Sequence, residues 1–188
     1  EWNRDRSRIL TRNGDIAQLW NTATGQEMSR FPHDDDVTEA HWDVDESFIL
    51  TISDDDTIRL WDAETSRPTI SLTGHTDWIR SVAWAPDGER LLSVSDDGTA
   101  RIWQINVTPG VIVLQGHTDE ANEVAWHPGG KLLASGGKDN LVRLWQLSSA
   151  GSGAEPEAGH PVAVLEGHTG WIWSVAWRPD GTQLATAS

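Results

Sequence analysis

The chain has 188 residues, of which 37% are hydrophobic, so it is long and apolar enough to bury a globular core. It contains 0 cysteines, which excludes disulfides and thiolate metal sites and favours a cytoplasmic location. Its formal net charge of −15, from 29 acidic and 14 basic residues, argues against nucleic acid as a partner, and no stretch approaches the roughly 20 apolar residues of a membrane helix.

Tryptophan recurs at regular intervals in this chain, which has 12 Trp but only 2 Phe and 0 Tyr. Four segments place a tryptophan nine residues after a histidine: "PHDDDVTEAHW" at 32–42, "GHTDWIRSVAW" at 74–84, "GHTDEANEVAW" at 116–126 and "GHTGWIWSVAW" at 167–177. Steps of 42, 42 and 51 residues separate the histidines, which are His33, His75, His117 and His168. The chain is therefore repetitive, with one insertion before the last of these histidines.

Each repeat contains four short runs of alternating or β-branched apolar residues, which in one repeat are "IRSVAW", "RLLSVS", "TARIW" and "VIVLQ". Gly and Asp in the intervening "PDG", "DDG" and "TPG" supply turn conformations, and no segment shows a helical pattern of apolar residues. We therefore predict an all-β chain of four-stranded antiparallel units. In chain order they cover residues 1–31 (partial), 32–73, 74–115, 116–166 with an inserted loop at 148–160, and 167–188 (partial).

This combination of a Gly-His pair, four strands and a third-strand tryptophan in about 42 residues resembles the WD-repeat β-propeller family, and the resemblance covers essentially the whole chain. At the end of the third strand, the Trp-Asp dipeptide itself survives only at Trp61-Asp62. Rings of this family have roughly four to eight blades, most often seven, so the resemblance implies that this chain forms an incomplete ring of about four and a half blades. We expect either a longer chain or self-association through the incomplete blades.

The resemblance also implies a buried hydrogen-bonded tetrad in each complete blade. Its members are a histidine, a second-strand Ser or Thr, a hairpin Asp and a third-strand Trp, which together can satisfy one another's hydrogen bonds. The three matching sets are His33, Thr51, Asp55 and Trp61; His75, Ser93, Asp97 and Trp103; and His117, Ser135, Asp139 and Trp145.

The second set could also be interpreted as a Ser, His and Asp hydrolase triad. A nucleophile occurs once in a pocket, however, whereas this set is repeated and ends on a Trp donor, so we interpret it as structural. Histidines in separate blades cannot converge on one ion, and we expect no metal and no cofactor. A second tryptophan series closes the first strands and is expected to wedge between blades: Trp42, Trp84, Trp126 and Trp177.

Function is then expected at positions that do not repeat. Trp78, Trp171 and Trp173 fall where the resemblance implies the upper rim of the propeller, although they could instead pack against the loops of the next blade. The candidate partner-binding residues are Trp78, Arg80, Asp96, Glu120, Asn122, Lys138, Trp171 and Trp173. Acidic residues in the same region favour a basic partner: Asp36, Asp54, Asp96 and Glu120.

The sequence thus predicts a non-catalytic interaction scaffold that binds a protein or peptide on its top face. One alternative is a sensor or autoregulatory segment of a larger NTPase or kinase, because bacterial members of the family often carry such repeats behind a nucleotide-binding or kinase domain. Another is direct catalysis, for which the non-repeated candidates are Glu39, His41 and Glu123.

Overall fold

The computed structural model describes residues 1–105, 111–147 and 159–188, and over these ranges the chain folds into strands without any helix. The prediction of an all-β fold is confirmed. The structure divides into two compact units, Glu1–Ile79 and Arg80–Ser188, each of which is described by itself. The predicted turn at 108–110 and most of the predicted insertion lie outside the described residues, but the insertion is predicted two residues too long, because Gly159 and His160 already belong to a strand.

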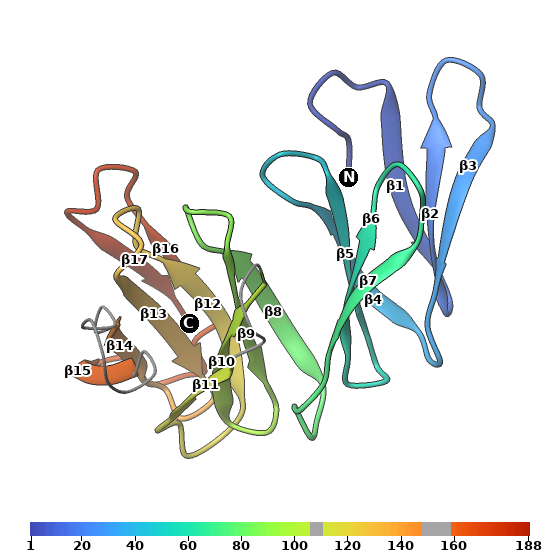
Figure 1. The fold of residues 1–188 in the computed structure, drawn as a ribbon. Helices are drawn as coiled ribbons and strands as arrows, with labels where there is room; N and C mark the ends of the chain where they lie inside the picture. Colours follow the sequence, from blue (N-terminus) through green and yellow to red (C-terminus); the bar gives the residue numbers. More distant parts are fainter. Residues whose placement is uncertain (106–110, 148–158) are drawn as a thin grey trace, which may run out of the picture. The chain divides into compact units, whose positions relative to one another are not determined.

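The first unit contains two antiparallel sheets (Figure 1). The first sheet has the order β1-β2-β3, with strands β1 (Arg8–Asn13), β2 (Ile16–Asn21) and β3 (Glu27–Pro32). The second has the order β4-β5-β6-β7, with strands β4 (Val37–Trp42), β5 (Phe48–Ser53), β6 (Ile58–Asp62) and β7 (Pro68–Leu72). Strands that follow one another in the chain are therefore neighbours in the sheet, as short hairpin connections require.

The remaining strands form two further four-stranded sheets and one two-stranded sheet. One consists of β8 (Ile79–Trp84), β9 (Arg90–Ser95), β10 (Thr99–Gln104) and β11 (Val111–Gln115). The next consists of β12 (Ala121–Trp126), β13 (Leu132–Gly137), β14 (Val142–Leu147) and β15 (Gly159–Leu165), followed by the pair β16 (Ser174–Trp177) and β17 (Leu184–Ala187). Each of the three ranges predicted to hold a complete blade contains one four-stranded sheet.

The hairpins between the second and third strands share one backbone conformation. Asp56, Gly98 and Asn140 occupy the same place in successive sheets and all have positive φ, of 61°, 75° and 63°. Gly, Asn and Asp are the residues that tolerate this left-handed conformation best. This local preference fixes each hairpin and therefore the register of the two strands that it joins.

Two of the first-strand tryptophans, Trp42 and Trp126, lie where neighbouring sheets pack together within a unit. Trp126 is 8% exposed, donates from Nε1 to the carbonyl oxygen of Ala83 in β8 at 3.1 Å, and has the guanidinium of Arg90 4.9 Å from its ring centroid. In the first unit, the Arg8 guanidinium stacks on Trp42 in the same way, also at 4.9 Å. These tryptophans therefore join consecutive sheets through apolar contact and cation–π attraction.

Candidate functional site

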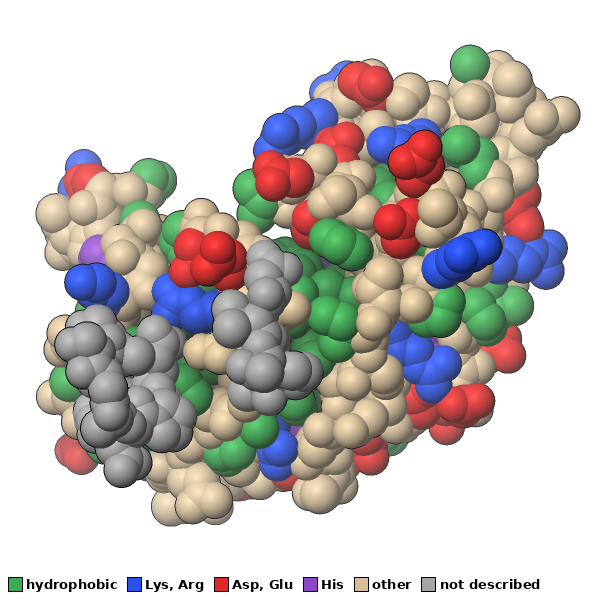
Figure 2. Space-filling model, in the orientation of Figure 1, with side chains coloured by type: hydrophobic (Ala, Val, Ile, Leu, Met, Phe, Trp, Pro, Cys, Tyr) green, Lys and Arg blue, Asp and Glu red, His purple; other side chains and the backbone are tan. Residues whose placement is uncertain are grey.

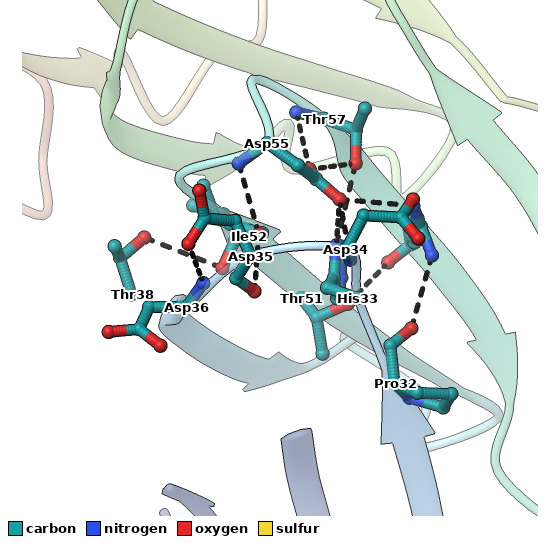
Figure 3. A network of polar contacts seen from close by, with 12 residues as sticks. Pro32, His33, Asp34, Asp35, Asp36, Thr38, Thr51, Ile52, Asp55 and Thr57 are labelled. Atoms are coloured by element: carbon teal, nitrogen blue, oxygen red, sulfur yellow. Dashed lines mark hydrogen bonds and ion pairs between the residues drawn. The ribbon is translucent and has the colours of Figure 1, made fainter. Parts of the chain in front are cut away.

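The first predicted tetrad forms a continuous chain of hydrogen bonds in the first unit, and Figure 3 shows three of its members, His33, Thr51 and Asp55. The indole Nε1 of Trp61 donates to Thr51 Oγ1 at 2.8 Å, Thr51 Oγ1 lies 2.6 Å from His33 Nε2, and His33 Nδ1 lies 3.0 Å from Asp55 Oδ2. An indole N–H can only donate and a carboxylate can only accept. With His33 neutral and its proton on Nδ1, the protons point in one direction along the chain, from tryptophan through threonine and histidine to aspartate.

The third tetrad has the same geometry in the second unit. Trp145 Nε1 donates to Ser135 Oγ at 2.9 Å, Ser135 Oγ lies 2.8 Å from His117 Nε2, and His117 Nδ1 lies 3.0 Å from Asp139 Oδ1. Ser135 is 0% exposed and Trp145 is 1% exposed. The network ties β13, β14 and the segment before β12 together through direct side-chain hydrogen bonds.

The members of the second tetrad belong to both units, with His75 in the first and the other three in the second. His75 is 6% exposed. In the second unit Trp103 Nε1 donates to Ser93 Oγ at 2.9 Å. Ser93, the candidate nucleophile of the triad interpretation, is 0% exposed and accepts this tryptophan proton, so its oxygen does not face a substrate.

Parts of the same network occur in the two partial sheets. Trp20 Nε1 donates to Thr11 Oγ1 at 2.8 Å, although Thr11 was not predicted as a member. In the last sheet His168 Nε2 lies 2.8 Å from Thr186 Oγ1, as the 18-residue spacing in the sequence suggests.

A recurring arginine, which the sequence interpretation missed, joins each complete tetrad. Arg59 Nη2 lies 3.0 Å from Asp55 Oδ2, and Arg143 Nη1 lies 2.6 Å from Asp139 Oδ2. Arg101 Nη2 lies 3.9 Å from the corresponding carboxylate of the second tetrad. The signal was present, since an arginine stands two residues before the third-strand tryptophan in "IRLW", "ARIW" and "VRLW". The arginine compensates the buried carboxylate, so the histidine can stay neutral.

Burial and hydrogen bonding together lower the pKa of the histidine and of the aspartate in the first and third tetrads. Desolvation lowers the pKa of His33 and of His117 below the usual histidine value of 6.5, despite the attraction of the paired aspartates. For Asp55 and Asp139, burial would raise the pKa, but the hydrogen bonds from their threonine and histidine neighbours outweigh it and lower the pKa. Neutral histidine and ionised aspartate are therefore the stable pair at neutral pH.

Exposed aromatic side chains gather on one segment between β15 and β16. Trp171 is 47% exposed and Trp173 is 58% exposed, whereas Ile172 between them is 0% exposed. The two indole rings meet edge to face, with centroids 5.6 Å apart and an interplanar angle of 63°. Alternation along an extended segment therefore sends one side chain into the protein and presents its two neighbours to solvent.

Ile172 anchors this segment to the neighbouring sheet. Its backbone N–H donates to the carbonyl of Gly137 at 3.1 Å, and its carbonyl accepts from Asn122 Nδ2 at 3.0 Å. A Cβ atom placed on Gly136 would lie 2.4 Å from Ile172 Cγ2, so only glycine leaves room for this side chain. Gly136 thus positions the two exposed tryptophans, a role that the sequence interpretation did not recognise.

Ion pairs connect the charged residues predicted for the same surface. Arg80 contacts both carboxylate oxygens of Asp96 in a bidentate pair, and its Nη2 lies 4.0 Å from Glu120 Oε2. Lys138 Nζ forms an ion pair with Glu120 and lies 4.7 Å from the centroid of the Trp171 ring. Two of the four carboxylates predicted to attract a basic partner, those of Asp96 and Glu120, are therefore paired within the chain. On the face that Figure 2 draws, acidic and basic side chains likewise lie beside one another.

The structure thus brings seven of the eight candidate binding residues into one connected group, which we call the rim cluster: Arg80, Asp96, Glu120, Asn122, Lys138, Trp171 and Trp173. The eighth, Trp78, belongs to the first unit and is 50% exposed.

Of the residues considered for catalysis, His41 lies between two carboxylates in the first unit, those of Glu39 and Glu1. His41 Nε2 lies 3.0 Å from Glu39 Oε2, and this hydrogen bond raises the pKa of His41. In the second unit Ser81 Oγ donates to Glu123 Oε1 at 2.6 Å. Within the described ranges no three His, Cys, Asp or Glu side chains gather as metal ligands would, and no helix there could span a membrane.

The repeated antiparallel sheets, joined by first-strand tryptophans and tied internally by Trp, hydroxyl, His and Asp networks, define a repeat protein built from propeller blades. The family model described as WD domain, G-beta repeat matches residues 25–62, 66–104, 110–146 and 159–188, and the chain belongs to this family. Its members typically act as non-catalytic scaffolds for protein interactions. The search of curated proteins found no match.

Each matched segment begins with the outer strand of one sheet and continues into the inner strands of the next. The match at 66–104, for example, contains β7 and then β8 to β10. A complete sheet therefore needs two consecutive repeats, which couples neighbouring repeats covalently as well as by packing.

Proposed function

We propose that this chain is a non-catalytic scaffold whose rim cluster binds a protein or peptide partner, and that it works in the cytoplasm. The observation that supports the proposal best is the pair of tryptophans, 47% and 58% exposed, held on a backbone that is fixed by the fully buried Ile172. Tryptophan and arginine dominate the binding energy of protein interfaces. A rigid aromatic pair also loses little conformational entropy when a partner binds.

The surroundings of the tryptophans also favour a protein partner. Lys138 and Glu120 offer polar contacts around the aromatic centre, as the rim of an interface does. By contrast, the repeated hydroxyl groups are buried and hydrogen-bonded, so they support the surface without taking part in binding.

The test is the effect of single substitutions on the affinity of a purified partner. Partners are captured with the immobilised full chain, identified, purified, and titrated calorimetrically against the wild type, Trp171→Ala and Trp173→Ala. We expect each substitution to weaken binding at least about tenfold, because a hot-spot residue contributes about 2 kcal/mol or more. Trp2→Ala is the matched control, since Trp2 is also a large exposed side chain, at 55%.

The thermal unfolding midpoint of both rim variants should stay within a few degrees of the wild type, because their side chains are half exposed. Equal affinity of the wild type and both rim variants for every purified partner would refute the proposal.

A further inference from the structure

We propose that the partner inserts an arginine side chain into the place that Lys138 now occupies, between the carboxylate of Glu120 and the ring of Trp171. This inference rests on the proposed function and deepens it by naming the chemical group that is recognised. The seated ammonium group of Lys138 is the observation that supports it, because this group forms an ion pair with Glu120 and lies 4.7 Å from the Trp171 centroid. The rim cluster therefore already contains a working cation site.

The two cations of the rim cluster, Arg80 and Lys138, are held differently from each other. Arg80 grips Asp96 through two parallel N–H to oxygen contacts, and the Asp96 side chain is only 8% exposed, so this pair is a fixed part of the fold. Lys138 instead contacts Glu120 through a single ammonium group, and the side chains of Lys138 and Glu120 are 18% and 30% exposed. The lysine is thus the cation that a competitor can replace.

Replacement of Lys138 needs no change in the backbone. The N–H of Lys138 donates to the carbonyl of Glu120 at 2.8 Å, which holds the hairpin in place whatever the side chain does. The four-carbon side chain can therefore rotate into solvent while the site keeps its shape. Trp173, next to Trp171 and 58% exposed, then offers a second aromatic surface to the incoming group.

An arginine suits this site better than a second lysine does. Its planar guanidinium can donate two hydrogen bonds to one carboxylate and stack on an indole ring at the same time, and it is more weakly hydrated than an ammonium group. The net charge of −15 favours the approach of a cationic segment. Because the carboxylates of the rim cluster are already paired, specificity comes from the planar guanidinium, which can bind both carboxylate oxygens where an ammonium group acts as a point charge.

The experiment uses the full chain labelled with ¹⁵N and three short probe peptides, acetyl-Gly-X-Gly-amide, in which X is arginine, lysine or the uncharged arginine analogue citrulline. Binding is followed by the indole N–H signals of Trp171 and Trp173, each assigned by its Trp→Phe variant. We expect the arginine probe to shift both signals, the lysine probe to bind more weakly, and the citrulline probe to cause no shift.

Two substitutions separate competition from simple charge effects. Lys138→Met removes the internal competitor and should tighten binding of the arginine probe about three- to tenfold, the worth of one exposed ion pair and cation–π contact. Lys131→Met is the matched control, because it removes the same charge from an exposed turn outside the rim cluster and should leave the affinity within about twofold. Glu120→Gln should abolish the preference for arginine over citrulline.

Equal effects of Lys138→Met and Lys131→Met, weaker binding by Lys138→Met, or equal shifts with arginine and citrulline would each overturn the inference. These results leave the proposed function standing if Trp171→Ala still weakens a purified natural partner. If Trp171→Ala does not weaken that partner, the proposed function itself fails.

Discussion

Replacing Ser135 with alanine removes the centre of the best-described hydrogen-bond network. Ser135 Oγ accepts from Trp145 Nε1 at 2.9 Å and lies 2.8 Å from His117 Nε2, and the side chain of His117 is only 1% exposed. The substitution therefore leaves one buried donor and one buried acceptor without a partner. At about 1–3 kcal/mol for each group, we expect the free energy of unfolding to fall by about 2–6 kcal/mol.

The assay is chemical unfolding followed by tryptophan fluorescence and far-ultraviolet circular dichroism, with partner binding measured in parallel. The matched control is Ser135→Thr, because Thr51 fills the same position in the preceding unit and makes both contacts there. Threonine should restore most of the loss, and partner affinity should not change. A loss below about 0.5 kcal/mol, or equal losses for alanine and threonine, would refute the assignment of this network as a stabilising element.

Two further predictions concern acidity and packing. When the pH falls from about 7.5 to about 5.5, the free energy of unfolding should fall by at most about 1.4 kcal/mol per pH unit for each histidine. The reason is that the pKa values of His33 and His117 are lowered in the folded chain, so the unfolded chain binds protons that the folded chain does not. A pH series of chemical unfolding in a His41→Gln background, which removes a histidine of raised pKa, checks this, and stability that rises toward acid would contradict it. Gly136→Val should destabilise the chain by about 1–3 kcal/mol and alter the indole signals of Trp171, because a Cβ there would lie 2.4 Å from Ile172 Cγ2. Unfolding and ¹⁵N spectra measure both effects, and a variant as stable as the wild type with unchanged signals would show that the contact does not constrain the segment.

The sequence predicts the sheets and the tetrads because both depend on spacing. A strand needs about six residues and a hairpin needs a residue that tolerates positive φ, so the period fixes where each element begins. Trp61 is paired with Ile49, two residues before Thr51 in the neighbouring strand. Because side chains alternate along paired strands, Thr51 and Trp61 lie on the same face of the sheet. The recurring arginine could have been predicted from the same spacing.

The connections within the rim cluster could not be predicted in this way. Lys138 and Trp171 are far apart in the chain and occupy positions that differ from repeat to repeat, so no period shows that they touch. The ion pair between Lys138 and Glu120 likewise depends on the rotamers of two long side chains. Sequence reasoning therefore finds the acidic and basic residues of this surface but not which of them pair with one another.

The tryptophan segment is built into the fold rather than merely left exposed. In the second unit, the large Val94 and the small Ala121 stand one repeat before Gly136 and Ile172, and both belong to one buried cluster. One sheet further on the sizes are reversed, because Gly136 is small and Ile172 fills the space above it. A random exposure of Trp171 would not need a compensating change in the core of another sheet. The reversed sizes of Gly136 and Ile172 therefore mean that packing holds the segment of Trp171 and Trp173 in one conformation. A fixed conformation is the condition for an exposed aromatic side chain to act as a binding anchor.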